Sequence, residues 1–373
     1  MFKAIGVVLL VTAGVLGASS AAQATSLPVT TLTGFNNASG VAFSQDGSLA
    51  FVVEDDDGTM GGEAAIKVVD SQTLAPLSER IPAGVPGAGV NHAIVMAPNG
   101  TKAYVSLGAG VIKPFYPATR SFGPAISLGT SGIGQVVFSP DGTKAYAAVT
   151  NNGSGTLVKA LDVATDTVTA SVTTCGGPDG LAITPDGAKV FVNCSDGTLA
   201  VIEAGGNTVI HSFTPTGHLQ GTTITMAPDG ANLYVTAFSI PSTVTSVINT
   251  TTYGIEHQFT DEPKDAAFNA DGSLANIFSA SSGDLIPTNS TTFASETPID
   301  VMSPSPGEWF LIDKNPAADQ YWISGAHSVF VVGTFTMLPN TGAKSSALWF
   351  SGMGALALLV VGAGFVRLGR RTS

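Results

Sequence analysis

The 373-residue chain contains few of the side chains that most often carry catalysis, with only five histidines and two cysteines. The histidines are scattered over the sequence and show no metal-ligand spacing. The sequence also lacks a GxSxG nucleophile motif, an HExxH zinc motif and a glycine-rich phosphate-binding loop. No sequence motif therefore supports a serine hydrolase, a zinc protease or a nucleotide-binding enzyme.

Charged residues are also sparse, at 11% of the chain, whereas glycine is abundant, with 44 residues. This composition favours tight turns and buried strands over helices. The segment 25–341 contains all 27 acidic residues but 10 of the 15 basic ones, which gives it a formal charge of −17. Such an acidic body argues against nucleic acid as a partner, because phosphate backbones are bound by basic surfaces.

One turn motif recurs through the middle of the chain, and its clearest copy is the octapeptide 139–146, SPDGTKAY. Proline presets the first corner of a turn, Asp or Asn suits the next position, and Gly takes the left-handed position that closes a hairpin. Two further strand-like segments follow each hairpin, such as 156–162 and 167–172. The acidic or amide residues of the six copies are Asp46, Asn99, Asp141, Asp186, Asp229 and Asp271.

These copies recur at intervals of 42 to 53 residues, and four strands per repeat of this size are typical of a propeller blade. The segment 25–336 is therefore predicted to be one all-β domain, a seven-bladed β-propeller with four-stranded antiparallel blades. The seventh unit, placed at 300–312, has lost the Asp-Gly pair, and 113–117 is expected to interrupt a strand of the second blade. The strand-like segment 27–33 is predicted to close the ring as the outer strand of the last blade, although 328–335 competes for that position.

The motif 139–146, with its continuation through 151–157 and 161–168, resembles the repeats of YVTN-type β-propellers, which are common in bacterial and archaeal surface proteins. The resemblance covers nearly all of the chain between its two apolar ends. It implies the propeller fold much more than any activity, because propellers host unrelated functions.

The N-terminal residues 1–24 are typical of a secretory signal peptide. Lys3 precedes an apolar run, and Ala22-Gln23-Ala24 supplies the small residues expected before a cleavage site at Thr25. The alternative is an uncleaved membrane anchor, for which the apolar run is short. The mature protein is expected to be exported.

The C-terminal end resembles a cell-wall sorting signal of the LPxTG type. The short segment 337–346 contains the motif, 347–366 is apolar, and 367–373 is basic. In that family a sortase cleaves between the positions of Thr341 and Gly342 and joins the threonine to the peptidoglycan cross-bridge. The apolar segment is long enough to span a membrane, and a permanent single-span anchor is the alternative. The motif residues are Leu338, Pro339, Asn340, Thr341 and Gly342.

Polar residues at the start of each inner strand are candidates for a ligand site at the mouth of the central channel. They were found by counting back six or seven residues from each turn, and the last one rests on a looser alignment. The alternative is that they are ordinary polar residues at strand starts. The candidates are Ser39, His92, Gln135, Asp179, Thr222, Asp265 and Asp300.

Two smaller features complete the set of candidate sites. The acidic run Glu54, Asp55, Asp56 and Asp57 offers oxygen ligands for calcium, although its spacing fails the EF-hand pattern and a solvated loop is the alternative. No other cofactor is predicted.

Cys175 and Cys194 fall on the same face of one blade, and a disulfide is the expected state in an exported protein. Its loop of about 20 residues is expected to contribute about 3 kcal/mol.

Three functions fit this organisation. The first is a wall-anchored binding module for a protein, a glycan or a small ligand. The second is a propeller enzyme, lactonase-like or a dehydrogenase subunit, with a metal or cofactor in the channel. The third is a structural envelope protein that acts through lateral contacts. The enzyme requires that His92, Asp179, Asp265 and Asp300 converge on one site in the channel.

Overall fold

A computed structural model describes most of the chain between residues 27 and 333. The described ranges are 27–54, 62–77, 80–86, 93–108, 110–129, 132–150, 155–215, 220–238, 243–260, 263–279, 281–302, 311–325 and 328–333. They belong to one compact unit, Ser26–Leu338. The predicted signal peptide, sorting motif and apolar C-terminal segment lie outside these ranges. Within them, no helix has the length and apolar character needed to cross a membrane.

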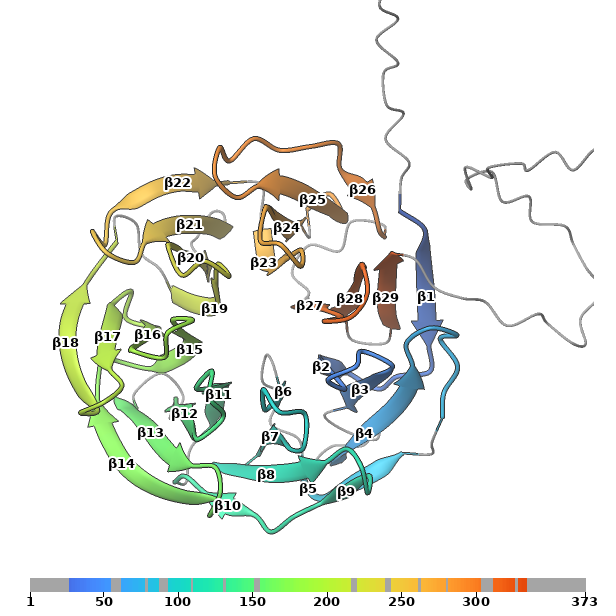
Figure 1. The fold of residues 1–373 in the computed structure, drawn as a ribbon, viewed down its shortest axis with the longest axis horizontal. Coiled ribbons are helices and arrows are strands. Elements are labelled where there is room, and N and C mark those ends of the chain that lie inside the picture. Colours follow the sequence, from blue (N-terminus) through green and yellow to red (C-terminus); the bar gives the residue numbers. More distant parts are fainter. Residues whose placement is uncertain are drawn as a thin grey trace, which may run out of the picture. The chain divides into compact units, whose positions relative to one another are not determined.

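The described residues form seven antiparallel sheets arranged around a central axis (Figure 1). Numbered along the chain and listed from the axis outward, the first blade contains β2 (Ala38–Phe43), β3 (Leu49–Glu54), β4 (Glu63–Asp70) and β5 (Ile81–Pro86). The third contains β11 (Ile133–Phe138), β12 (Lys144–Val149), β13 (Leu157–Asp162) and β14 (Thr167–Thr173). The fourth contains β15 (Pro178–Ile183), β16 (Lys189–Cys194), β17 (Leu199–Glu203) and β18 (Thr208–Phe213).

The remaining blades follow the same plan. The fifth contains β19 (Gln220–Met226), β20 (Asn232–Phe238), β21 (Thr243–Asn249) and β22 (Ile255–Phe259). The sixth contains β23 (Pro263–Phe268), β24 (Leu274–Ser279), β25 (Asp284–Asn289) and β26 (Ile299–Asp300). The predicted all-β, seven-bladed propeller with four-stranded antiparallel blades is therefore confirmed.

The second blade differs from the prediction in its details. It contains β6 (Ile94–Met96), β7 (Ala103–Leu107) and β8 (Val111–Tyr116), and β8 runs through Pro114 without interruption. The irregularity lies instead in the outer strand, which is divided into β9 (Ser121–Phe122) and β10 (Ile126–Ser127). Proline is tolerated in β8 because the outer strand is interrupted opposite it: β10 pairs with Val111 and Ile112 and β9 with Phe115 and Tyr116, so neither pairs with Pro114.

The two ends of the described chain meet in the seventh blade. From the axis outward this blade contains β27 (Leu311–Lys314), β28 (Gln320–Ser324), β29 (Ser328–Gly333) and β1 (Val29–Thr33). The predicted ring closure by the N-terminal strand is confirmed, and β29 is the third strand rather than a competitor for the outer position. Closure in this way covers the outer edge of β29 and joins the first described strand to the last blade.

The position predicted for the start of the seventh blade is wrong. Asp300 lies in β26, the outer strand of the sixth blade, where it pairs with Asp284. The inner strand of the seventh blade begins at Leu311, and its turn contains Asn315 and Pro316. The alignment failed because this turn has lost the Asp-Gly or Asn-Gly pair that marks the other six.

The core lies between neighbouring blades. One cluster joins Tyr146 and Ala148 of the third blade to Leu181 and Val192 of the fourth. The junction between the last and first blades is packed in the same way, with the rings of Trp322 and Phe43 in edge contact at 5.6 Å. Burial of both faces explains why the second strands of the blades, such as β3, β7 and β12, are largely apolar and buried along most of their length.

The Lys-Ala-Tyr part of the repeat joins each blade to the next. Lys144 Nζ and Tyr146 Oη of the third blade both donate to the carbonyl oxygen of Ala204 in the fourth, at 3.1 Å. One junction earlier, Lys102 Nζ and Tyr104 Oη donate to Asp166, at 2.7 and 2.6 Å. The repeated Lys and Tyr are thus explained by a contact that recurs between blades.

Candidate functional site

Seven hairpin turns encircle one end of the channel and contact one another. We call them the turn collar; they are the turns at 44–47, 97–100, 139–142, 184–187, 227–230, 269–272 and 315–318. Each of the six turn glycines has φ between 66° and 73° and lies against the turn of the preceding blade. A Cβ added to Gly230, for example, would lie 2.8 Å from Pro185. Proline and glycine recur in these turns because they fit against each other around the ring.

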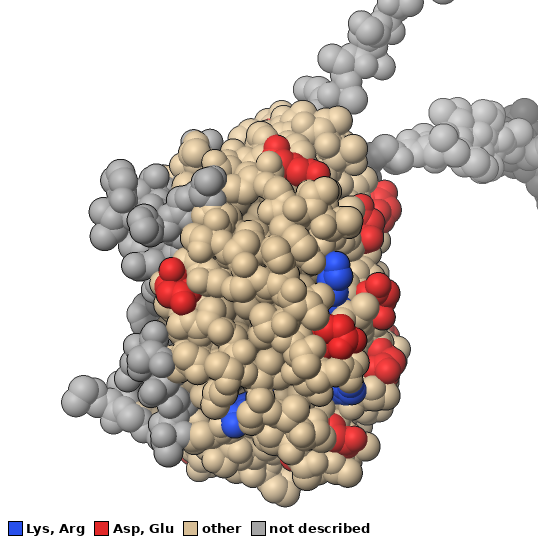
Figure 2. Space-filling view, turned by 90° about the vertical axis from the view of Figure 1, so that its left-hand side faces the viewer, with Lys and Arg blue, Asp and Glu red and all other residues tan. Residues whose placement is uncertain are grey.

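Exposed carboxylates stand on the turn collar. In the clearest copy, Ser139 Oγ donates to Asp141 Oδ1 at 2.6 Å and Thr143 N donates to the same atom at 3.0 Å. Hydrogen bonds of this kind from neighbouring hydroxyl groups lower the pKa of the turn carboxyls, which are therefore ionised at neutral pH. The carboxyls with a lowered pKa are those of Asp46, Asp141, Asp186 and Asp271. Acidic side chains gather along one face of the propeller in side view, on the right in Figure 2.

A cavity of about 620 Å³ fills the channel between the middle of the inner strands and the turn collar. Its wall is mainly apolar, with Gln135, Thr225, Asp313 and Lys314 among its polar members. Each inner strand contributes one residue at an equivalent position: Ala42, Val95, Val137, Ala182, Thr225, Ala267 and Asp313. A cavity of this size with an apolar wall and a few polar groups is typical of a small-molecule site.

The residues predicted to ring the channel mouth do not form a ring in the described structure. They fall where the inner strands carry a bulge, as between Ala38 and Gly40 or between Pro178 and Gly180. A bulge changes which face a side chain occupies, so a count of six residues and a count of seven select different positions. Gln135 lines the cavity, Ser39 and Asp265 are buried, Asp179 is half-buried, and Asp300 is exposed on an outer strand. His92 and the side chain of Thr222 lie outside the described residues.

Two of the predicted ring residues bind the next blade through their side chains. Gln135 Oε1 accepts a hydrogen bond from Leu181 N at 3.0 Å, and Asp265 Oδ2 accepts one from Ile312 N at 3.2 Å. Asp313, which the sequence reasoning missed, accepts in the same way from Val41 N at 3.1 Å. The signal that would have found Asp313 is the Asn315-Pro316 turn, since a polar residue two positions before a turn faces the channel.

Glu54 belongs to an internal ion pair rather than to an open acidic loop. Its carboxylate is fully buried at the end of β3, where it pairs with Lys67 Nζ at 2.8 Å and Arg80 Nε at 3.5 Å. It also accepts a hydrogen bond from Asn36 N at 2.8 Å. The interpretation of this residue as a solvated charge is therefore wrong, and its carboxylate is already paired with two cationic side chains. Asp55, Asp56 and Asp57 lie outside the described residues.

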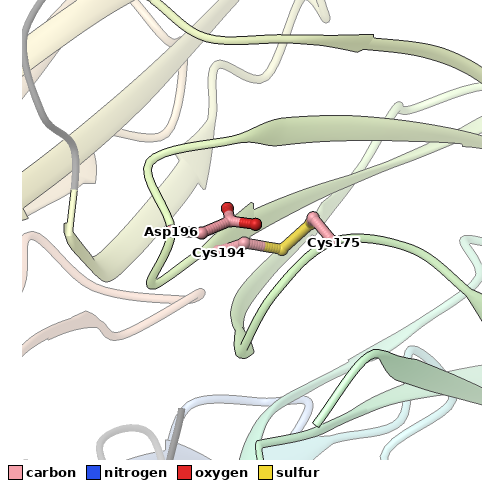
Figure 3. A group of neighbouring side chains, drawn as sticks. All are labelled: Cys175, Cys194 and Asp196. Atoms are coloured by element: carbon pink, nitrogen blue, oxygen red, sulfur yellow. A yellow bond between two sulfur atoms is a disulfide. The ribbon is translucent and has the colours of Figure 1, made fainter. Parts of the chain in front are cut away.

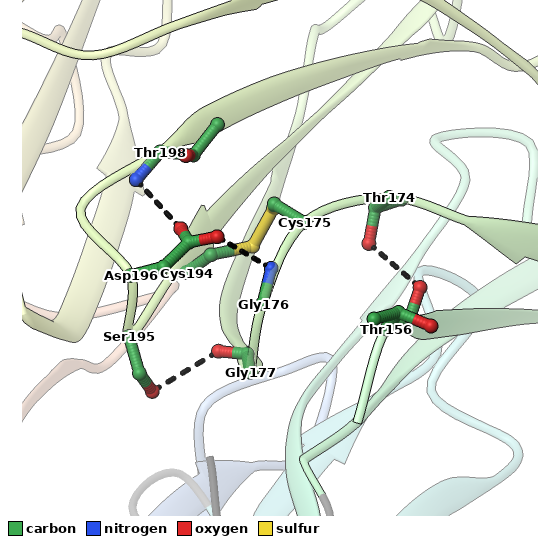
Figure 4. Close-up of a disulfide and its surroundings, with 9 residues drawn as sticks. All are labelled: Thr156, Thr174, Cys175, Gly176, Gly177, Cys194, Ser195, Asp196 and Thr198. Atoms are coloured by element: carbon green, nitrogen blue, oxygen red, sulfur yellow. Dashed lines mark hydrogen bonds between the residues drawn. A yellow bond between two sulfur atoms is a disulfide. The ribbon is translucent and has the colours of Figure 1, made fainter. Parts of the chain in front are cut away.

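The disulfide Cys175–Cys194 fixes the opposite end of the fourth blade, with a Cα–Cα distance of 6.0 Å. Asp196 lies beside the sulfur atoms (Figure 3). Its two carboxylate oxygens accept from Gly176 N at 2.7 Å and Thr198 N at 2.9 Å (Figure 4). The carboxylate thus reinforces the link between the segment before β15 and the turn after β16. Both sulfurs are bonded to each other, so in this state they offer no thiolate to a metal.

Solved structures support the propeller fold. The chain is similar to the β-propeller domain of Cps50 (Swd1) from Myceliophthora thermophila, with a TM-score of 0.66 and 12% identity, over 82% of this chain and 100% of that one. It is also similar to hydrazine synthase from Kuenenia stuttgartiensis, with a TM-score of 0.66 and 16% identity, over 81% and 97% of the two chains. At these identities the likeness concerns the fold alone.

Searches at the level of sequence added no relative. No family model matches the chain, and no curated protein matches it. The YVTN-type resemblance therefore rests on the repeat residues themselves.

Proposed function

We propose that the protein is a binding module held on the outside of a Gram-positive-type envelope, with a small ligand carried in the channel of its propeller. The observation that carries the ligand-binding role is the 620 Å³ cavity, whose wall combines apolar side chains with a few polar groups. The proposed anchor rests on the sequence 338–342 and the apolar and basic segments after it. Sortase and the peptidoglycan cross-bridge are the partners that this anchor requires.

Placement of the candidate carboxylates favours binding over metal-dependent catalysis. Asp265 lies in the inner strand of the sixth blade and Asp300 in the outer strand of the same blade, so the two do not meet in the channel. Asp265 and Asp313 each accept a hydrogen bond from the backbone of a neighbouring blade. These carboxylates therefore hold the inner strands together, whereas a catalytic metal would need them to converge on one point.

Anchoring is tested in the wall fraction of the native cells. We expect muramidase digestion to release the wild-type protein as fragments that end at Thr341 and carry cross-bridge peptide, identified by mass spectrometry. Thr341→Ala should remain with the membrane, whereas Thr372→Ala, a threonine outside the motif, should behave like the wild type. Wild-type protein that retains residues 342–373 would show a permanent membrane anchor instead.

Ligand binding is tested separately, by native mass spectrometry of the protein isolated from its own envelope. We expect the wild type to carry a non-covalent small molecule that is lost on denaturation. Thr225→Phe places a ring in the cavity and should remove that mass, with circular dichroism used to confirm folding. A wild-type protein without any bound molecule would overturn the ligand-carrying role.

A further inference from the structure

The fourth blade brings two sulfur atoms and a carboxylate together. Cys175 precedes β15, Cys194 ends β16, and Asp196 lies in the turn after β16. One oxygen of Asp196 and the two sulfur atoms all lie within 4.8 Å of one another (Figure 3). This separation is small enough for three ligands of a single metal ion. In the disulfide the sulfurs are bonded to each other, so the group becomes a ligand set only after reduction.

The two segments that carry the cysteines are also joined by contacts that do not use sulfur. Ser195 N donates to the carbonyl oxygen of Gly177 at 2.8 Å, and Asp196 N donates to that of Gly176 at 3.1 Å. In the opposite direction, Gly176 N donates to Asp196 Oδ2 at 2.7 Å (Figure 4). Reduction breaks the covalent bond and leaves these hydrogen bonds in place. The two thiols therefore remain beside Asp196 in the reduced protein.

The carboxylate of Asp196 is held in position independently of the sulfurs. A Cβ added to Gly176 would lie 2.8 Å from Asp196 Oδ2, so glycine at this position allows the carboxylate to approach the backbone next to Cys175. The other oxygen accepts from Thr198 N at 2.9 Å. Each oxygen thus accepts one backbone hydrogen bond and keeps a second lone-pair site. The side chain is exposed, which leaves that site open to an ion from solvent.

The chemistry of these donors selects the kind of cation. Zn²⁺ binds cysteine sulfur and aspartate oxygen in tetrahedral sites, whereas Ca²⁺ and Mg²⁺ take oxygen ligands. Three protein ligands leave the fourth tetrahedral position to a water molecule. Cys194 is fully buried and Asp196 is exposed, so solvent reaches the group from the side of the carboxylate.

From these contacts we propose that the reduced fourth blade binds one Zn²⁺ ion through Cys175, Cys194 and Asp196, and that the disulfide is the metal-free form. In the reduction, two molecules of a small thiol are oxidised to their own disulfide, while the protein S–S bond breaks and each cysteine sulfur gains a proton. Binding of Zn²⁺ then releases both protons to solvent. The site lies outside the channel, so it does not depend on the ligand-carrying role proposed above.

The first test compares two redox forms of the full wild-type chain. One sample stays oxidised, and the other is reduced with a phosphine that is then removed by anaerobic gel filtration. Isothermal titration calorimetry with Zn²⁺ gives the stoichiometry, and Cd²⁺ is the optical probe because cadmium thiolates absorb in the ultraviolet. We expect the reduced form to bind one equivalent of Zn²⁺ more than the oxidised form, and to be the only form that develops the cadmium absorption.

Variants of the reduced protein assign the three ligands. Replacement of both Cys175 and Cys194 by Ser should abolish the additional equivalent. Asp196→Asn should weaken Zn²⁺ at least about tenfold, since even the partners of metal ligands contribute this much. Asp229→Asn is the matched control, because Asp229 Oδ1 also accepts from a backbone N two residues later, at 2.9 Å, but lies in the turn collar. It should bind Zn²⁺ as the wild type does, and circular dichroism without metal confirms the folding of each variant.

X-ray absorption of the zinc-loaded, reduced wild type identifies the ligands without any substitution. We expect two sulfur neighbours at about 2.3 Å and oxygen neighbours at about 2.0 to 2.2 Å. Four sulfur neighbours would mean that two molecules share one ion, and equal zinc stoichiometry of the two redox forms would mean a structural disulfide only. Either result would overturn the site. Unchanged affinity of Asp196→Asn would overturn the three-ligand assignment.

Discussion

The two ends of the inner strands are built differently. At the turn collar, six hairpins use the same Gly conformation and the same contact with the preceding turn. At the other end, where the inner strands carry their bulges (the bulged end), a similar hydrogen bond from the backbone of the next blade is accepted by different side chains, Gln135 at one junction and Asp265 at another. A residue recurs in every blade where only that residue fits the contact, as glycine does in the collar, whereas a backbone N–H can be accepted by several kinds of side chain.

The largest expected effect concerns the bulged end. Replacement of both Cys175 and Cys194 by Ser should lower the free energy of unfolding by about 3 kcal/mol, because a covalent loop of this length restricts the unfolded chain. Thermal melting of the variant, beside the wild type with and without reductant, measures this effect. If the oxidised and reduced wild type melt together, the fourth blade does not depend on its disulfide.

The next effect belongs to the turn collar. Gly47→Ala should cost about 2 kcal/mol, because Ala is strained at φ 66° and its Cβ would collide with the side chains of Asn315 and Ala317. Gly34→Ala has φ 87° but open space, and should cost about 1 kcal/mol. Gly254→Ala meets only an ordinary contact and serves as the control. Equal costs for Gly47 and Gly34 in chemical denaturation would show that contact between turns is unimportant.

A third change tests how much the side-chain contacts of the bulged end contribute to stability. Asp265→Ala leaves Ile312 N buried without its acceptor and should cost about 1 to 2 kcal/mol. Asp265→Asn retains an acceptor oxygen and should recover part of that loss. Gln135→Ala, at a half-buried site, should cost less than Asp265→Ala. Denaturant midpoints give the order, and identical losses at the two sites would show that the burial of the accepting side chain does not set the cost.

The smallest expected effect is the pH dependence of the turn collar. Hydroxyl hydrogen bonds hold the pKa of Asp141 and Asp186 below their ordinary value of 3.8. A lowered carboxyl pKa stabilises the fold above the ordinary value, and this contribution is lost as the pH falls through the folded value. Asp141→Asn should therefore reduce the acid sensitivity of melting. Carboxyl titration by NMR that gave ordinary values for the collar would contradict this account.

Much of the fold was predictable because the turn chemistry is local. An Asp-Gly or Asn-Gly pair, preceded by proline in four of the six copies, identifies each hairpin from local residues. Its recurrence gives the blades and, with segment 27–33, the closure of the ring. The seventh blade was misplaced because its turn at Asn315 and Pro316 lacks that local signal. Strand pairing, which the turn residues do not encode, instead places Asp300 beside Asp284 in the outer strand of the sixth blade.

The candidate site was harder to predict because strands alternate their faces. A bulge inserts one residue at the point from which the ring was counted, so Gln135 and Asp179 were treated as equivalent although they are not. The hydrogen bond from Ile312 N to the Asp265 carboxylate could not be predicted either, because the two residues are distant in the sequence. The cavity itself depends on seven strands meeting at one axis, which no single repeat encodes.

The pairing of β1 with β29 sets the order of events when the protein is made. β1 is the first of the strands to be synthesised, yet its partner β29 ends at Gly333 and is the last. The seventh blade therefore cannot be completed until β29 has been synthesised. Until then β1 remains without its partner strand, while the strands of the other six blades are already available to pair. Closure over so long a loop is entropically unfavourable and slow. A chain truncated before Ser328 would consequently lack β29 and would leave β1 without its partner strand.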